Sequence, residues 1–398
     1  MMRAQFLKVL PLGVVGLLLL GTGCGDGGNP DDSGAVGSTG DDPTTSASGG
    51  PTTEEPPATT EEPPATTGEP SDDSTTGEPS DDSTTGEPEP LPSEIPLTDD
   101  AIPEDLIVYD GYLYVSNFVD ASVLRVSLDD LEDISVFVPP ADPGEALVSG
   151  WGLDVLESES WLLTIANAPL NLMGPPAADG EVRAYALADG SLAQTWSMPT
   201  GFQGNSIDTG PGGMIYIGDF GQPRIIRIDP STDEVTLWKE DAVAWPPGGF
   251  GLGGMIVDNA GDAVYVSGGS SLWRVPINGD GSAGDSELVS LTDDGGADFV
   301  WGGADGMSQA ADGSIYFAQN DAFTPGAVGT AWRVQLDDST SGTISMVADG
   351  LADPSGAVAA SHNGEDYLLI NESQFGYFFG IDEGNPVLPY RVLVYPQS

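Results

Sequence analysis

Six short stretches of this sequence share one pattern, an arginine embedded in an apolar run typical of a β-strand. The arginines are Arg125, Arg183, Arg227, Arg274, Arg333 and Arg391. A second apolar run precedes each of them, and the centres of these runs recur at intervals of 49, 53, 49, 51 and 53 residues, at Tyr114, Leu163, Tyr216, Tyr265, Tyr316 and Leu369. A long, regular period with several short strands in each repeat is typical of a β-propeller. We therefore predict an all-β fold, a six-bladed β-propeller of four-stranded antiparallel blades.

The order of the strands within a repeat follows from the turns between them. An innermost strand begins with small or polar residues and ends in a turn rich in Gly, Asp and Asn, as tight β connections require. The tyrosine-centred strand comes second, the arginine-centred strand third, and a less distinct outer strand fourth. The sixth repeat ends after its third strand, so we expect residues 94–97 to supply its outer strand and close the ring.

We expect the six arginines to stabilise this ring rather than to carry chemistry. The chain has only ten Lys and Arg against 63 Asp and Glu, so acidic partners are abundant. Guanidinium groups pair well with carboxylates. We predict that the arginines pair with acids on neighbouring blades or turns.

The first 24 residues have the features of an export signal. Arg3 and Lys8 precede a short apolar run that ends in small residues and in Cys24, the single cysteine of the chain. This pattern resembles a bacterial lipoprotein signal peptide over residues 1–23, after which the cysteine becomes the lipidated N-terminus, although Gly21 stands where an aliphatic residue is usual. The alternative is an ordinary secretory signal with an incidental cysteine. The resemblance implies a protein of the bacterial cell envelope, lipid-anchored and facing the periplasm or the exterior.

A low-complexity segment follows the signal. Residues 25–97 contain no Lys, Arg or aromatic residue, and they repeat the motifs TTEEPPA and TTGEPSDDS. Such a composition cannot bury enough apolar surface to offset chain entropy. We expect residues 24–97 to form a disordered, acidic tether rich in Thr, Pro and Glu, and residues 98–398 to form the propeller.

The propeller itself is also acidic. Of the 63 acidic residues, 18 lie in residues 25–97 and 45 in residues 98–398, where only eight of the ten basic residues lie. Such a charge repels nucleic acid and anionic lipid and favours cations. We expect no nucleic-acid partner, no membrane contact beyond the lipid anchor, and a monomer. Solubility in a salty environment is an alternative cause of the charge.

Polar side chains are predicted to gather at one face of the ring. In an antiparallel blade the start of the first strand and the end of the second lie on the same face. Oxygen-bearing side chains of the kind found at both places suit a hard cation, above all calcium. The first-strand starts supply Glu104, Asp105, Trp151, Asp154, Asn205, Gly253, Asp305 and Ser355. The second-strand ends supply Asn117, Asn167, Asp219, Asn320 and Asn371.

Three of these segments resemble a known family. Pro103-Glu104, GNSIDTGPGGMIYIGD around Asn205 and ADGMSQAADGSIYFAQ around Asp305 are similar to the calcium-binding six-bladed propellers of the senescence-marker-protein, gluconolactonase and regucalcin-like group. That group is related to paraoxonase-like and diisopropylfluorophosphatase-like hydrolases. The resemblance implies that Glu104, Asn205 and Asp305 hold Ca2+. Gly253 stands where the family has a further asparagine, so one ligand would come from water, a backbone carbonyl or Asn167.

The resemblance also implies a reaction, the hydrolysis of a small ester or lactone. Calcium would polarise the carbonyl, and Asp305 or a metal-bound water would act as base or nucleophile. The one histidine, His362, lies in a turn that we expect on the opposite face. The sequence has no G-x-S-x-G motif, zinc-ligand spacing or phosphate-binding loop. The alternative is a non-catalytic surface propeller that binds a ligand or a protein partner, with Asp and Asn serving only to cap turns.

Overall fold

The structure is a computed structural model of the 398-residue chain, and it describes residues 89–171, 175–246, 251–269 and 271–397. The chain divides into two compact units, Met1–Asp81 and Asp82–Ser398, and all described residues belong to the second. The predicted signal peptide, Cys24 and the tether up to residue 88 lie outside the described residues.

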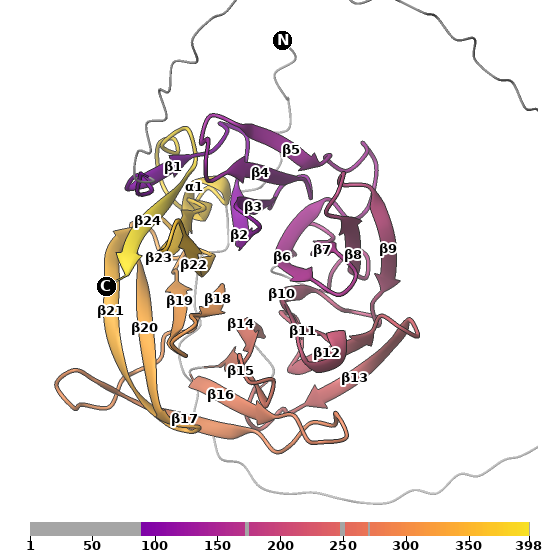
Figure 1. Cartoon of the computed structure of the whole chain (residues 1–398), viewed down its shortest axis with the longest axis vertical. Helices are drawn as coiled ribbons and strands as arrows, with labels where there is room; N and C mark the ends of the chain where they lie inside the picture. The colour runs from indigo at the N-terminus through magenta and orange to yellow at the C-terminus, as the bar shows by residue number, and fades with distance from the viewer. Residues whose placement is uncertain (1–88, 172–174, 247–250, 270, 398) are drawn as a thin grey trace, which may run out of the picture. The chain divides into compact units, whose positions relative to one another are not determined.

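The described residues form antiparallel β-sheets arranged around a common centre (Figure 1). Four sheets have four strands each, and in three of them the strands run from the centre outward in chain order. The first contains β2 (Pro103–Tyr109), β3 (Tyr112–Asn117), β4 (Val123–Ser127) and β5 (Ile134–Val138). The second contains β6 (Ser149–Leu156), β7 (Trp161–Asn167), β8 (Glu181–Ala186) and β9 (Leu192–Ser197). The third contains β10 (Gly204–Thr209), β11 (Ile215–Asp219), β12 (Arg224–Asp229) and β13 (Glu234–Glu240).

A larger sheet of eight strands consists of two antiparallel halves of four. The outer strands of the halves, β17 and β21, are joined by a short parallel pairing in which Ser290 lies opposite Ser341. One half contains β14 (Leu252–Val257), β15 (Ala263–Gly268), β16 (Ser271–Pro276) and β17 (Glu287–Asp293). The other contains β18 (Met307–Gln309), β19 (Ile315–Gln319), β20 (Gly329–Asp338) and β21 (Ser341–Leu351).

The last sheet joins the two ends of the described chain. Its strands are β22 (Ala357–His362), β23 (Glu365–Glu372), β24 (Arg391–Gln397) and β1 (Glu94–Pro96). Ile95 of β1 lies opposite Val392 of β24 and is fully buried. The prediction that residues 94–97 supply the missing outer strand is therefore confirmed.

The innermost strands are linked to one another by side chains that accept backbone hydrogen bonds. Asp105 of β2 accepts from the Leu153 N–H of β6 at 2.9 Å, and Asp208 of β10 accepts from the Val257 N–H of β14 at 2.7 Å. In the same way, the Ser308 hydroxyl of β18 accepts a hydrogen bond from the Ala359 N–H of β22 at 2.9 Å. These bonds satisfy backbone groups that would otherwise be buried without partners.

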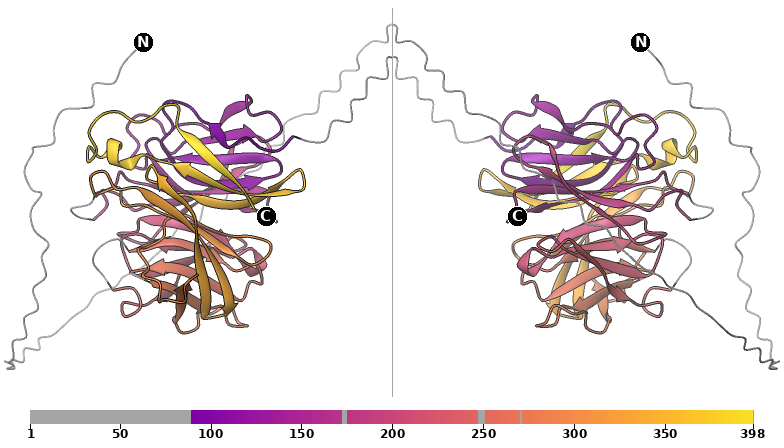
Figure 2. Two further views of the ribbon diagram at one scale, coloured as in Figure 1. Left: turned by 90° about the vertical axis from the view of Figure 1, so that its left-hand side faces the viewer. Right: turned by 90° about the vertical axis from the view of Figure 1, so that its right-hand side faces the viewer.

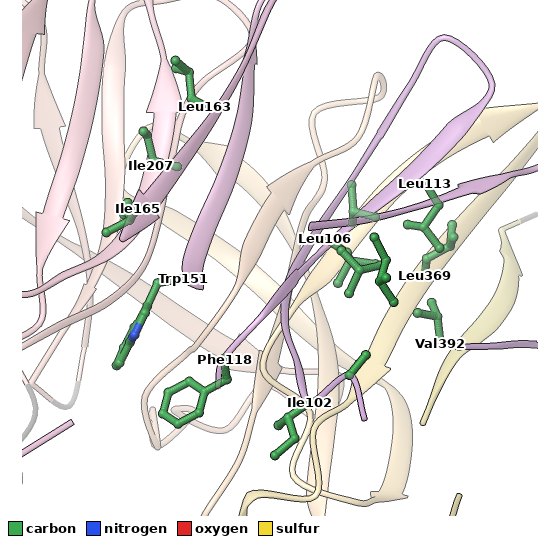
Figure 3. Close-up of a cluster of buried hydrophobic side chains, with 14 of the residues drawn as sticks. Ile102, Leu106, Leu113, Phe118, Trp151, Leu163, Ile165, Ile207, Leu369 and Val392 are labelled. Carbon is green, nitrogen blue, oxygen red and sulfur yellow. The ribbon is translucent and has the colours of Figure 1, made fainter. Parts of the chain in front are cut away.

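Apolar side chains between the sheets form the core. Figure 3 shows part of the largest cluster, to which Leu106 of β2, Leu163 of β7, Ile207 of β10 and Leu369 of β23 contribute. Alternation along each strand directs these residues inward. Burying each one stabilises the fold by about 1.5–3 kcal/mol.

All six arginines of the sequence pattern lie on third strands, as the repeat order predicts. In four of the sheets or half-sheets the arginine lies directly opposite the central tyrosine, for example Tyr216 opposite Arg227. Arg333 pairs with Asp312 in the turn between β18 and β19, as predicted, whereas Arg274 pairs with Glu287 on a strand of its own half-sheet. The expected acidic partners are thus present in part, and they come from the arginine's own sheet as well as from loops.

The side views show where the strands begin and end (Figure 2). The single α-helix of the described residues, α1 (Phe375–Phe378), lies at one face of the ring, and the end of β24 lies at the other. We call the face that carries α1 and the starts of the inner strands the mouth face. Among the described residues, no helix is long and apolar enough to span a membrane.

We predict that Arg391 is the main polar contact that holds the closing sheet together. Its guanidinium donates to Glu372 at 2.6 Å and to Glu94 of β1 at 2.9 Å. Arg391→Ala would leave the Glu372 carboxylate, whose side chain is only 5% exposed, without its cation. We expect the free energy of unfolding to fall by about 2–4 kcal/mol, measured by urea denaturation.

Glu94→Ala is the matched control, because it removes the exposed partner of the same arginine. Exposed ion pairs contribute at most about 1 kcal/mol. An equal loss of stability in the two variants would contradict the prediction.

Candidate functional site

A pocket of about 670 Å³ opens at the mouth face. Its polar lining includes Glu104 at the start of β2, Asn205 at the start of β10, Asp305 just before β18 and Asn320 just after β19. The structure therefore brings three of the predicted site residues, Glu104, Asn205 and Asp305, into one cavity. We call this cavity the mouth pocket.

Glu104 is almost completely buried, with 4% of its surface exposed. Burial, followed by the nearby carboxylates of Asp105 and Asp305, raises the pKa of Glu104 well above its usual range. Its Oε2 atom has no hydrogen-bond partner among the described residues. A buried carboxylate oxygen without a partner is costly, which indicates that a cation, a proton or a polar ligand group belongs beside it.

Asp305 is held by two side-chain amides. Asn320 donates to its Oδ2 at 2.8 Å, and Asn205 approaches its Oδ1 at 3.5 Å. These bonds favour the ionised form, but burial outweighs them and raises the pKa of Asp305 to about 7. The carboxyl group can therefore take up or release a proton near neutral pH.

No positive charge offsets these acids in the mouth pocket. Among the described residues that line it there is no Lys, Arg or His. His362 lies at the end of β22 on the opposite face, where its ring contacts Asn363 and lies 3.6 Å from Asp129. The mouth pocket is thus suited to a cation or to an uncharged ligand, and unsuited to an anion.

Gly253, the position at which the sequence resemblance implied an asparagine, lines the mouth pocket. A Cβ atom at this position would overlap the carbonyl oxygen of Ala304. Its own carbonyl oxygen accepts a hydrogen bond from Ser206 at 3.0 Å. Close packing against the segment ahead of β18 therefore leaves no room for a side chain at position 253.

Asn167, also predicted as a metal ligand, lies outside the mouth pocket and bonds to the backbone of Gly204. Its side-chain nitrogen donates to the Gly204 carbonyl at 2.7 Å, and its side-chain oxygen accepts from the Gly204 N–H at 3.2 Å. Asn167 is not among the residues that line the mouth pocket. Its amide ties the end of β7 to the start of β10, which is a structural contact.

The structure also shows a wall of aromatic rings in the mouth pocket. Phe118 lies 5.6 Å from Trp151 and 4.9 Å from Phe375, measured between ring centroids (Figure 3 shows the first pair). We call the lining rings the aromatic wall: Phe118, Trp151, Phe220, Phe323, Phe375 and Phe379. Only Trp151 was singled out from the sequence. The signal for the others was an aromatic residue one to seven positions after the end of a second strand.

A second cavity, of about 850 Å³, lies among the inner strands. Asp154, predicted for the mouth face, lines this cavity instead, together with Asp208. Burial raises the pKa of both carboxyls, that of Asp154 to about 6, and the charge of Asp154 raises the pKa of Asp208 further. The two carboxyl groups thus share one cavity, where the ionisation of one disfavours the ionisation of the other.

Comparisons with known proteins show the fold. No protein-family model matches the chain, and no curated protein matches it either. The major allergen Mala s 1 of Malassezia sympodialis is similar with a TM-score of 0.58 at 15% identity, over 77% of this chain and 96% of that chain. A protein of unknown function from Bacteroides thetaiotaomicron has a TM-score of 0.51 at 15% identity, over 76% and 72% of the two chains.

A calcium-binding protein, regucalcin from Agrobacterium tumefaciens, is also among the similar structures. Its TM-score is 0.48 at 16% identity, over 71% of this chain and 85% of that chain. At such low identities the likenesses concern the fold alone. The sheet order and these comparisons together confirm the prediction of an all-β propeller built of antiparallel sheets.

We predict that the buried Asp305 makes stability depend on pH. Because its pKa is about 7 in the folded chain and near 3.8 when exposed, the folded state binds more protons than the unfolded state between these values. The free energy of unfolding should then fall as the pH rises from about 4 to 7. Asp305→Asn should remove about 2–4 kcal/mol of this fall, measured by urea denaturation in a chelator.

Asp321→Asn is the control for this experiment. Asp321 lines the same pocket but is exposed, so Asp321→Asn makes the same chemical change without removing a buried acid. If Asp305→Asn and the wild type show the same slope, the carboxyl of Asp305 is not the cause.

A second prediction concerns the glycine of the mouth pocket. Gly253→Ala places a methyl group against the Ala304 carbonyl and should lower the free energy of unfolding by about 1–3 kcal/mol. Gly279→Ala is the control, because a Cβ at Gly279 meets open space. Equal stability of the two variants in thermal denaturation would show that the strand has room for a side chain at position 253.

Proposed function

We propose that this chain is an exported lipoprotein with a six-bladed, gluconolactonase-like propeller that binds calcium and hydrolyses small esters or lactones. Six blades result when each half of the eight-stranded sheet is counted as one blade. The observation that carries the proposal is the pair of buried carboxylates, Glu104 and Asp305, in a pocket whose described lining has no basic residue. The comparisons support the fold, and the chemistry rests on these residues.

The donor set fits calcium in kind. Calcium takes six to eight oxygen ligands, from carboxylates, amide or backbone carbonyls and water. Glu104 and Asp305 supply carboxylates, Asn205 supplies an amide oxygen, and the unpartnered Oε2 of Glu104 is open to a ligand. Among the described residues no group of three or more His, Cys, Asp or Glu could hold a metal ion. The proposed site has two carboxylates and an amide, so water would complete it.

The residues of the mouth pocket would divide the work of hydrolysis. Bound calcium would act as a Lewis acid that polarises the carbonyl of an ester or lactone. Asp305, oriented by the amides of Asn205 and Asn320, would act either as the base that takes a proton from the water attacking that carbonyl, or as the nucleophile that attacks it and is then released by water. Glu104 would bind the calcium ion at the buried end of the pocket.

The N-terminal residues complete the proposal. We propose that residues 1–23 direct export, that Cys24 carries the lipid, and that the acidic segment after it holds the propeller away from the membrane. The protein would then lie in the bacterial cell envelope, facing the periplasm or the exterior, as a monomer. The support for this is the sequence pattern described above.

A non-catalytic propeller that binds a ligand or a protein partner is the second candidate. The packing at Gly253 favours it, because it leaves no room for a fourth side-chain ligand. The position of His362 outside the mouth pocket favours it as well.

We predict that calcium stabilises the protein through Glu104 and Asp305. A ligand present at 100 times its dissociation constant raises the free energy of unfolding by about 2.7 kcal/mol. In the full chain purified in detergent, 1 mM CaCl2 should therefore raise the melting temperature by a few degrees relative to EGTA. Glu104→Gln and Asp305→Asn should abolish the rise, and Asp321→Asn should retain it.

Hydrolysis of lactones and aryl esters with and without EGTA then separates the two candidates. Activity that EGTA abolishes supports the hydrolase. Calcium binding without turnover of any ester supports the binding protein. If calcium produces no rise in melting temperature in the wild type, the metal site itself is refuted.

A further inference from the structure

Six of the eleven large, exposed apolar residues of the described chain lie at the mouth face. The large apolar residues with high exposure fall into two groups. One group lies on the outer strands of the sheets and contains Val136, Leu192, Leu237, Leu288 and Met346. The other lies in the loops of the mouth face and contains Val243, Val300, Val328, Phe378, Val387 and Leu388. None of these residues lies in the turns of the opposite face, so the exposed apolar residues outside the outer strands all lie on the face into which the mouth pocket opens.

The aromatic wall of the mouth pocket is held in place by contacts within the protein, before any ligand binds. The indole of Trp151 donates to the Ser149 hydroxyl at 2.8 Å, and that hydroxyl donates to the Phe118 carbonyl at 2.7 Å. The ring of Phe118 is packed edge-on against Phe375 at 4.9 Å. A preformed apolar surface of this kind binds an apolar body with little loss of side-chain entropy.

All the ionisable side chains of the described residues that line the mouth pocket are acidic. Glu104 and Asp305 lie at its buried end, and its described lining contains no Lys, Arg or His. An anionic ligand would be repelled without a compensating contact. A ligand rich in hydroxyl groups would lose hydration against the aromatic wall, because the rings offer few hydrogen-bond partners.

We propose that the mouth pocket takes an uncharged carbonyl compound with an alkyl or aromatic body. The body lies on the aromatic wall, and the carbonyl oxygen faces the cation that Glu104 and Asp305 would hold. The volume of about 670 Å³ leaves room for such a body in addition to a cation. The orientation of the carbonyl group rests on the proposed function, because it needs the calcium site, whereas the contact of the apolar body with the aromatic wall does not.

The first test compares matched substrates on the full chain in 1 mM CaCl2. γ-Nonalactone and γ-butyrolactone share one ring and differ in a pentyl chain, so kcat/KM should be at least about 10-fold higher for γ-nonalactone. Phenyl acetate should likewise exceed 4-carboxyphenyl acetate, which adds one negative charge, by at least about 10-fold. Equal or reversed preferences in either pair overturn the proposed ligand class.

The second test measures binding without turnover. The probe is 5-pentyl-2-pyrrolidinone, the lactam that corresponds to γ-nonalactone, titrated by calorimetry. Phe379→Ala and Phe323→Ala each remove a ring of the aromatic wall and should weaken binding at least about 10-fold. Tyr377→Ala is the control, because Tyr377 belongs to α1 but does not line the mouth pocket, and it should change binding less than about threefold.

The outcomes separate this inference from the proposed function. If the lactam binds, and binds more weakly to the Phe379→Ala and Phe323→Ala variants, but no ester is hydrolysed, the ligand class stands and the hydrolase is wrong. If esters are hydrolysed without regard to the pentyl chain, the hydrolase stands and the ligand class is wrong. Tighter binding of phenyltrimethylammonium than of the lactam would also overturn the proposal, because the ligand would then be a cation.

Discussion

The close approach of neighbouring inner strands is the constraint on which the rest of the structure depends. At Gly152 and Gly306 a Cβ would overlap backbone oxygens of the next inner strand, those of Asn205 and Ser355. Only glycine allows such contact. Because the strands approach so closely, side chains from β2, β10 and the residue ahead of β18 meet in one pocket. The same contact excludes a side chain at Gly253, so one constraint both assembles the candidate site and limits it.

The fold could be predicted from the repeat because its signals are local. An arginine opposite a tyrosine, as at Tyr265 and Arg274, identifies the third and second strands without knowledge of distant contacts. The closing strand was predictable for a related reason, since an unpaired edge at β24 requires a partner. The parallel link between β17 and β21 had no such signal, because it depends on how far two outer strands extend beyond their own sheets.

The candidate site could be predicted only in part. Asn167 and Asn320 follow second strands in the same way, yet one binds the backbone of Gly204 and the other binds Asp305. The difference lies in the loop that each side chain meets, and a repeat pattern does not contain it. The aromatic wall was missed for the same reason, since its rings come from the irregular loops of several sheets. Those loops are also the segments that differ most from repeat to repeat, and they determine what the mouth pocket can bind.

The pairing of β1 with β24 has a consequence for how the protein is made. Glu94 and Arg391 touch in the finished sheet but lie almost 300 residues apart, so a ribosome that has released β1 must still synthesise every other strand before its partner emerges. The inner sheets can form in order during translation, whereas β1 has to wait, and its short length leaves little exposed edge during that time. Pairing β1 with β24 is then the last step in closing the ring. A nascent chain that stops before β24 cannot form this pair.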